Sequence, residues 1–120
     1  MRYIVIKNHI VNEANLIKLK ENDRVLRLEE YIGNPVWQNW VYCISRDTLK
    51  EGWIPRVYLK DLSDESVLLE DYSSKELNVS VGDVVSLKKT VNNWAFCIHE
   101  HSGEEGWVPL ENLEIIKDHF

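Results

Sequence analysis

The chain has 120 residues, 44% of them hydrophobic and 28% charged, with a formal net charge of −6 at pH 7. This composition is typical of a folded globular protein and excludes a disordered chain. The negative charge repels nucleic-acid backbones and anionic membranes, so we expect neither as a partner. The apolar run Tyr3–Ile6 is too short for a signal peptide, and we expect a cytoplasmic protein.

Short apolar runs bounded by turn residues predict strands throughout the chain. In chain order they are Tyr3–Lys7, Asp23–Leu28, Trp40–Ser45, Gly52–Pro55, Val67–Leu69, Asp83–Lys88, Trp94–His99 and Gly106–Pro109. Polar segments at 88–93 and 101–105 have the character of hairpin connections, so neighbouring strands should pair antiparallel. Helix is predicted only as one short turn after Pro55 and another after Pro109, where proline presets φ.

The sequence contains an internal repeat. Five positions recur 54 residues later without a gap: Trp40, Cys43, Gly52, Pro55 and Leu59, matched by Trp94, Cys97, Gly106, Pro109 and Leu113. Upstream, residues 17–25 match residues 77–85 at an offset of 60, so the first copy holds six extra residues. Turn chemistry in Tyr31–Trp37 favours a longer loop there. A repeat of this length indicates two similar structural units.

Five short strands in about 60 residues are too few for a sandwich and should curl into a small barrel. The predicted fold class is therefore all-β, with two tandem five-stranded barrels. Residues 1–61 are expected to form the first barrel, 62–66 a short linker, and 67–120 the second barrel. The predicted interiors are Leu19, Val25, Leu28, Cys43, Ile54 and Leu59 in the first, and Val79, Val85, Leu87, Cys97, Val108 and Leu113 in the second.

Nothing in the sequence predicts catalysis or a cofactor, because it lacks a nucleophile elbow, a phosphate loop and a complete zinc motif. Cys43 and Cys97 lie in apolar runs and are expected to be buried core residues rather than a disulfide. His99 and His101 share a strand face with Cys97, but four ligands are not available, so no metal site is predicted.

The order of motifs resembles the Src homology 3 (SH3) family. The second copy carries the resemblance through Leu68–Tyr72, Glu76–Leu77, Gly82–Asp83, Trp94, Cys97 and Gly106–Pro109. The first carries it through Asn22–Asp23, Trp40, Cys43 and Gly52–Tyr58. The resemblance implies SH3-like barrels that bind proline-rich peptides across a row of aromatic side chains, beside an acidic loop that receives Arg or Lys.

Carried over by position, the resemblance implies two incomplete peptide-binding grooves. The expected contacts of the first copy are Trp40, Pro55, Tyr58 and Glu13, and those of the second are Tyr72, Trp94, Pro109, Asp71 and Glu76. At tyrosine positions of the family the first copy has Lys7 and His9, and the second has Glu70 and Asn112. Each groove should therefore bind weakly, and a ligand that spans both would gain from avidity.

The sequence leaves three functions open. The first is a non-catalytic tandem adaptor that binds protein or peptide segments, with Trp40 and Trp94 as exposed platforms. The second is a cell-wall peptide or glycan module, as in bacterial SH3-like domains. The third is a structural or oligomerisation module whose barrels pack on each other or on a second chain, with no ligand in the grooves. The alternative to an exposed platform for Trp40 and Trp94 is partial packing into the core. Trp53 and Trp107 are expected to be structural. The acidic pairs Glu29–Glu30 and Glu104–Glu105 are expected to be solvated surface.

Overall fold

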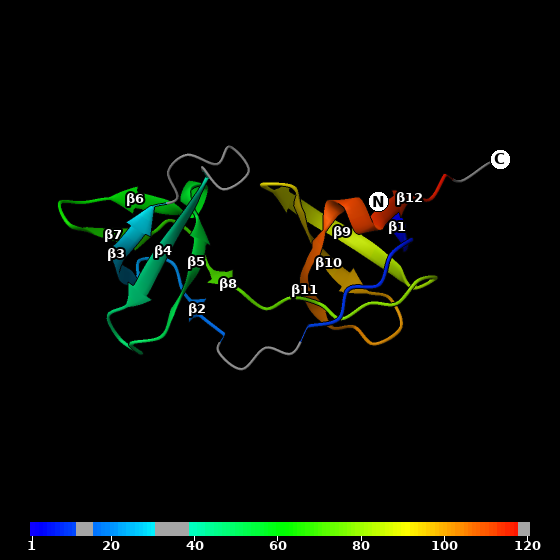
Figure 1. The fold of residues 1–120 in the computed structure, drawn as a ribbon, viewed down its shortest axis with the longest axis horizontal. Helices are drawn as coiled ribbons and strands as arrows, with labels where there is room; N and C mark the ends of the chain where they lie inside the picture. The colour runs from blue at the N-terminus through cyan, green and yellow to red at the C-terminus, as the bar shows by residue number, and fades with distance from the viewer. Residues whose placement is uncertain (12–15, 31–38, 118–120) are drawn as a thin grey trace. The chain divides into compact units, whose positions relative to one another are not determined.

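The computed structural model describes residues 1–11, 16–30 and 39–117. The described chain forms β-strands and short 3-10 turns, so the all-β prediction is confirmed. It divides into two compact units (Figure 1). The terminal unit consists of residues 1–13 and 75–120, and the central unit of residues 14–74. This division differs from the predicted one, which assigned residues 1–61 and 67–120 to separate barrels.

Each unit contains one antiparallel five-stranded sheet. In the terminal unit the order is β11 (Glu105–Pro109), β10 (Trp94–His99), β9 (Val84–Val91), β1 (Arg2–Val5) and β12 (Leu113–Ile115). In the central unit it is β5 (Glu51–Pro55), β4 (Trp40–Ser45), β3 (Arg24–Glu30), β7 (Glu65–Leu68) and β6 (Leu59–Asp61). A separate pair joins β2 (Lys18–Leu19) to β8 (Tyr72–Ser73).

The five-stranded sheets and the 3-10 turns of the two units correspond element by element. The 3-10 turns η2 (Arg56–Tyr58) and η3 (Leu110–Asn112) follow Pro55 and Pro109, as predicted. The bounds of β4, β5 and β6 recur 54 residues later as those of β10, β11 and β12. The repeat in the sequence is thus a repeat of local structure.

The first strands of the two copies have changed places. The strand β1 begins the chain, yet it pairs with β9 and β12, which lie beside it in Figure 1. The strand β7 begins the second copy, yet it pairs with β3 and β6 of the first. Val5 lies opposite Leu113 and Leu68 lies opposite Leu59, so the two strands fill equivalent places. The segment predicted as a linker, 62–66, forms the turn between β6 and β7 and the start of β7.

Both cores contain the residues that the repeat predicts, with one exception. The terminal core consists of Val5, Leu77, Val79, Val85, Ala95, Cys97, Val108 and Leu113, with Leu87 packed against it. The buried apolar residues of the central unit include Ile17, Leu19, Val25, Val41, Cys43, Ile54, Leu59 and Leu68. Leu28, predicted to be interior, is exposed because the register of β3 shifts between Arg27 and Glu29.

The recurring glycines of the repeat, on β5 and β11, allow another segment of the chain to approach the strand closely. A Cβ on Gly106 would lie 2.8 Å from the backbone nitrogen of Leu77, whereas a Cβ on Gly52 would meet the side-chain Cγ2 of Ile17 at 2.9 Å. Backbone cannot move aside as a side-chain methyl can.

We therefore expect Gly106→Ala to destabilise the protein by about 1–3 kcal/mol, and Gly52→Ala by clearly less. Urea unfolding followed by tryptophan fluorescence measures both. Equal losses for the two variants would contradict the close backbone approach at Gly106.

Asp61, at the end of β6, should contribute to acid sensitivity. Its pKa is held below the ordinary value of 3.8 by a hydrogen bond from Ser66 and by Arg27 and Arg56. A lowered folded-state pKa gives stability that is present above the unfolded value and is lost as the pH falls through the folded one. Below about pH 4, the wild type should lose more stability than Asp61→Asn, as measured by urea unfolding at several pH values. If the free energy of unfolding of the two proteins falls in parallel as the pH is lowered, this role of Asp61 is contradicted.

Candidate functional site

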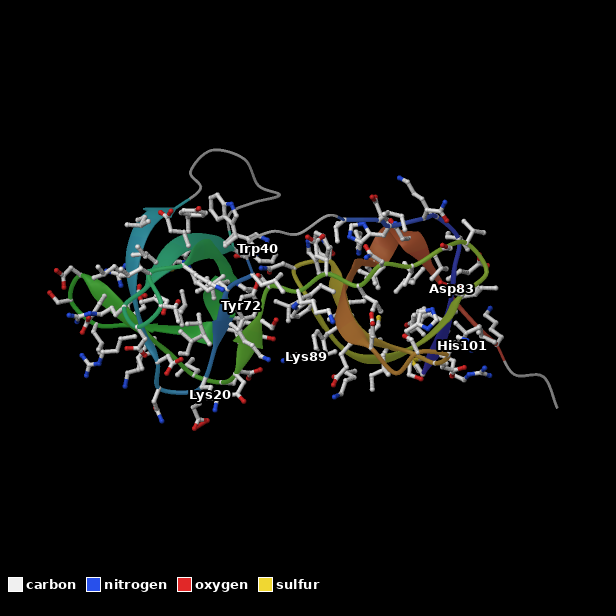
Figure 2. All side chains as sticks on the ribbon, turned by 90° about the horizontal axis from the view of Figure 1, so that it is seen from below. Lys20, Trp40, Tyr72, Asp83, Lys89 and His101 are labelled. Atoms are coloured by element: carbon white, nitrogen blue, oxygen red, sulfur yellow. The ribbon has the colours of Figure 1, made fainter. Side chains whose placement is uncertain are left out.

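The structure distributes the predicted contact residues differently from the sequence copies. Trp40, Pro55 and Tyr58 lie in the central unit, where Tyr72 joins them because it follows β7 (Figure 2). Trp94 and Pro109 lie in the terminal unit with Glu76. In each unit the tryptophan is the cross-strand partner of the proline, as Trp40 with Pro55 and Trp94 with Pro109.

The aromatic side chains of the central unit pack on one another. The rings of Tyr58 and Tyr72 are 5.1 Å apart between centroids, and the hydroxyl of Tyr72 donates a hydrogen bond to the carbonyl oxygen of Trp53 at 3.0 Å. Tyr58 is 2% exposed and Tyr72 is 6% exposed, and Pro55 is also buried. Among these four residues, only Trp40 is half-buried. It supplies most of their accessible surface.

In the terminal unit His9 occupies the place that Tyr72 has in the central unit. His9 forms a bridge with Val79, just as Tyr72 pairs with Leu19. Its ring meets that of Trp94 edge-on, with centroids 5.8 Å apart. Its Nε2 lies 2.9 Å from Oε1 of Glu76. The side chains of His9 and Glu76 are 17% and 27% exposed, and Trp94 and Pro109 are half-buried. We call these four residues the Trp94 surface.

Asn112 replaces the last tyrosine of the family pattern and has a structural role. It is buried, and its Nδ2 donates to the carbonyl oxygens of Lys7 and Asn8 at 3.1 and 3.3 Å. It therefore holds the segment after β1 to η3. The sequence indicated a missing contact at Asn112, but it gave no sign of this replacement bond.

The predicted acidic residues do not gather at one groove. Asp71, in the central unit, accepts a hydrogen bond from the backbone N–H of Glu21 at 2.9 Å and so fixes a turn. Glu76 belongs to the Trp94 surface. Glu13 lies outside the described residues. Glu111, exposed in η3, has a carboxylate oxygen 4.0 Å from the ammonium of Lys7. Of the predicted acidic residues, Glu76 is therefore the one whose carboxylate contacts another residue of the Trp94 surface.

Trp53 and Trp107 pack in matching ways on their own sheets. The ring of Trp53 meets that of Tyr42 with centroids 5.0 Å apart, and the ring of Trp107 meets that of Phe96 at the same distance, both edge-on at 66° and 64°. This packing agrees with the structural interpretation made from sequence.

His99 stabilises the turn that follows β10. His99 Nε2 lies 3.1 Å from a carboxylate oxygen of Asp83, and His99 Nδ1 accepts the backbone N–H groups of His101 and Ser102. A bond from the Ser80 N–H, together with His99, lowers the pKa of Asp83 (both Asp83 and His101 are labelled in Figure 2).

Burial raises the pKa of the Cys97 thiol to about 11. Within the described ranges no three His, Cys, Asp or Glu side chains could hold a metal ion.

The family comparison matches one stretch of the chain, residues 68–116, to the model described as the variant SH3 domain. Residues 68–116 are therefore similar in sequence to the variant SH3 domain. SH3-type domains are protein-interaction modules that generally lack catalytic activity. Comparison with curated proteins and with solved structures found no match. Among the described residues, none of the helical segments has the length and apolar character to span a membrane.

The SH3 match begins in the central unit, although most of its residues belong to the terminal unit. Residues 68–74 open the SH3 pattern in the sequence, but they complete the central unit, and residues 2–5 supply the first strand beside β9 and β12. The linear family pattern and the folded unit therefore differ in their first strand.

A double-mutant cycle tests whether Tyr72 lies beside Tyr58. We expect Tyr58→Leu and Tyr72→Leu to be coupled by about 0.5–1.5 kcal/mol, because the rings are in contact. Tyr72→Leu and Asn112→Ala should be additive within about 0.5 kcal/mol, because these residues lie in different units. Urea unfolding measures each variant. Coupling of Tyr72 to Asn112 instead would place Tyr72 in the terminal unit.

Proposed function

We propose that the chain is a non-catalytic adaptor that binds a peptide segment of a partner protein at the Trp94 surface. The observation that supports this most directly is that the half-buried Trp94 indole and the Glu76 carboxylate both contact His9. The SH3 match of residues 68–116 supports the module class. Three of the four residues of the surface, Glu76, Trp94 and Pro109, lie in the part of the chain that carries the match.

The chemistry of the surface favours a proline-rich peptide with a basic residue. Proline rings pack against flat aromatic side chains, and a polyproline segment loses little entropy on binding. A ligand Arg or Lys would approach Glu76 and compete with His9 for its carboxylate. The net charge of −6 attracts such a ligand. Competition with His9 and the missing tyrosines should keep the affinity low.

Trp40 is the proposed second contact, on the central unit. Its neighbours Pro55, Tyr58 and Tyr72 are buried, so we expect it to add affinity only when a ligand also binds the Trp94 surface.

A structural role is the second candidate, and the buried tyrosine pair favours it for the central unit. If Trp94 is also part of a packed interface, its removal should lower the free energy of unfolding or dissociate an oligomer, rather than only weaken binding.

An NMR titration tests the proposal. Isotope-labelled protein is mixed with proline-rich peptides that carry Arg or Lys at either end, and the five indole N–H signals are followed. We expect saturable shifts at Trp94. Trp94→Ala should weaken binding about 10-fold or more, and the matched Trp40→Ala should have a smaller effect. Glu76→Gln should weaken binding of the Arg peptide but not of the same peptide with Gln in place of Arg.

Silence of the Trp94 indole with every peptide would overturn the proposal. Unfolding of Trp94→Ala, seen by circular dichroism, would support the structural candidate instead.

A further inference from the structure

We infer that two residues in each first strand decide which unit that strand enters. Arg2 and Tyr3 direct β1 to the terminal unit, and Glu65 and Ser66 direct β7 to the central unit. These four are positioning residues, because they determine whether His9 or Tyr72 stands beside Trp94. Their effect on ligand binding rests on the proposed function, while their effect on strand pairing does not.

The first part of this selection is a reversal of charge. Arg2 binds Glu100 through two contacts, Nε to Oε1 at 2.7 Å and Nη2 to Oε2 at 3.0 Å. At the equivalent place in the central unit, Glu65 binds Arg46 at 2.7 Å and also Arg24. Arg46 and Glu100 are 54 residues apart, and Arg2 and Glu65 have equivalent strand registers. Both members of the ion pair are therefore reversed between the units.

With the first strands in their own copies, the same side chains would meet like charges. Arg2 would face Arg46 and Arg24, and Glu65 would face Glu100. Like charges that meet across a sheet are unfavourable, and such contacts discriminate between partners more than they stabilise the correct one.

The second part of the selection is the polarity of the next residue along each strand, which is Ser66 in β7 and Tyr3 in β1. Ser66 is 0% exposed. Its hydroxyl accepts a bond from Arg27 Nη1 at 2.9 Å and donates one to Asp61 at 2.8 Å. Arg27 also donates to the backbone oxygens of Ser63 and Glu65. The polar side chains therefore satisfy one another beneath β7.

The terminal unit has apolar residues at all three equivalent positions. Tyr3 replaces Ser66, Ile115 replaces Asp61 as its cross-strand partner, and Leu87 replaces Arg27 opposite the cysteine. Tyr3 and Leu87 both pack against the terminal core. In the unexchanged pairing, Tyr3 would cover Arg27 and Asp61 without the serine hydroxyl, and Ser66 would lie against Leu87 and Ile115. Both placements leave polar groups poorly satisfied.

The first strand that pairs in a unit also determines which residue, His9 or Tyr72, lies at the aromatic surface of that unit. His9 lies four residues after Val5, and Tyr72 lies four residues after Leu68. In the observed pairing, His9 meets Trp94 and Glu76, and Tyr72 meets Tyr58. The reverse pairing would place Tyr72 beside Trp94 and free the Glu76 carboxylate from His9. The four positioning residues therefore set the chemistry of the Trp94 surface.

Disulfide trapping in the full chain tests the inference. Ile4 is the register partner of Glu114 in the observed pairing, and its equivalent Val67 is the partner of Lys60. With Cys43 and Cys97 replaced by alanine, Ile4→Cys/Glu114→Cys reports the observed pairing, and Ile4→Cys/Lys60→Cys reports the reverse. Partners in antiparallel strands are close enough for a disulfide. Yields under mild oxidation are read by peptide mass mapping.

The decisive variant exchanges the two dipeptides: Arg2→Glu and Tyr3→Ser together with Glu65→Arg and Ser66→Tyr. The wild type should form mainly the 4–114 disulfide, and the exchanged variant should shift the ratio of yields toward 4–60 by about 10-fold or more. The control exchanges Lys7→Glu with Glu70→Lys, an equal charge change on the same two segments, and should keep the wild-type ratio.

A dominant 4–60 disulfide in the wild type, or an unchanged ratio in the exchanged variant, would overturn the inference. So would an equal shift in the control. If circular dichroism shows that the four-residue variant is unfolded, the charge exchange Arg2→Glu with Glu65→Arg decides: a shift toward 4–60 supports the inference, and no shift overturns it. Restoring opposite charges with Arg46→Glu and Glu100→Arg should then return the ratio to that of the wild type.

Peptide binding separates this inference from the proposed function. If the disulfides switch and the Trp94 indole responds to no peptide in either variant, the inference on pairing stands and the peptide-binding proposal fails. If the wild type binds but the disulfide ratio does not change, the proposal stands and the inference fails.

Discussion

The pairing of β1 with β9 and β12 is the constraint on which the rest of the structure depends. It joins the first residues of the chain to the last strand and places Val5 in the terminal core. It leaves an equivalent place in the central sheet, which β7 fills. Two similar copies that lie in one chain can exchange an element in this way because each strand fits the backbone of either sheet, and only side chains distinguish the partners.

The sequence predicts local structure well because local structure depends on nearby residues. The bounds of β4 and β10, the turns after Pro55 and Pro109, and most buried positions follow from the repeat and from strand alternation. The partner of β1 could not be predicted, because alternation fixes the face that a strand buries and not the sheet that it joins. Leu28 was misplaced for a related reason: a bulge shifts register without a residue type that marks it.

The same limit applies to the candidate site. Trp40 with Pro55 and Trp94 with Pro109 are cross-strand partners within one copy, so sequence places them correctly. Tyr72 and His9 follow the exchanged strands, so sequence assigns each to the wrong unit. The consequence is chemical: the central unit gains a buried tyrosine pair, and the terminal unit gains an imidazole between an indole and a carboxylate. The SH3 match alone would not distinguish these two surfaces.

Cross-strand nuclear Overhauser effects in the unmodified chain test the exchanged pairing most directly. The account predicts contacts of the Tyr3 backbone with Ile115 and Val85, and of the Ser66 backbone with Asp61 and Val25. Contacts of Tyr3 with Asp61 and Val25, and of Ser66 with Ile115 and Val85, would contradict it and would return each first strand to its own copy.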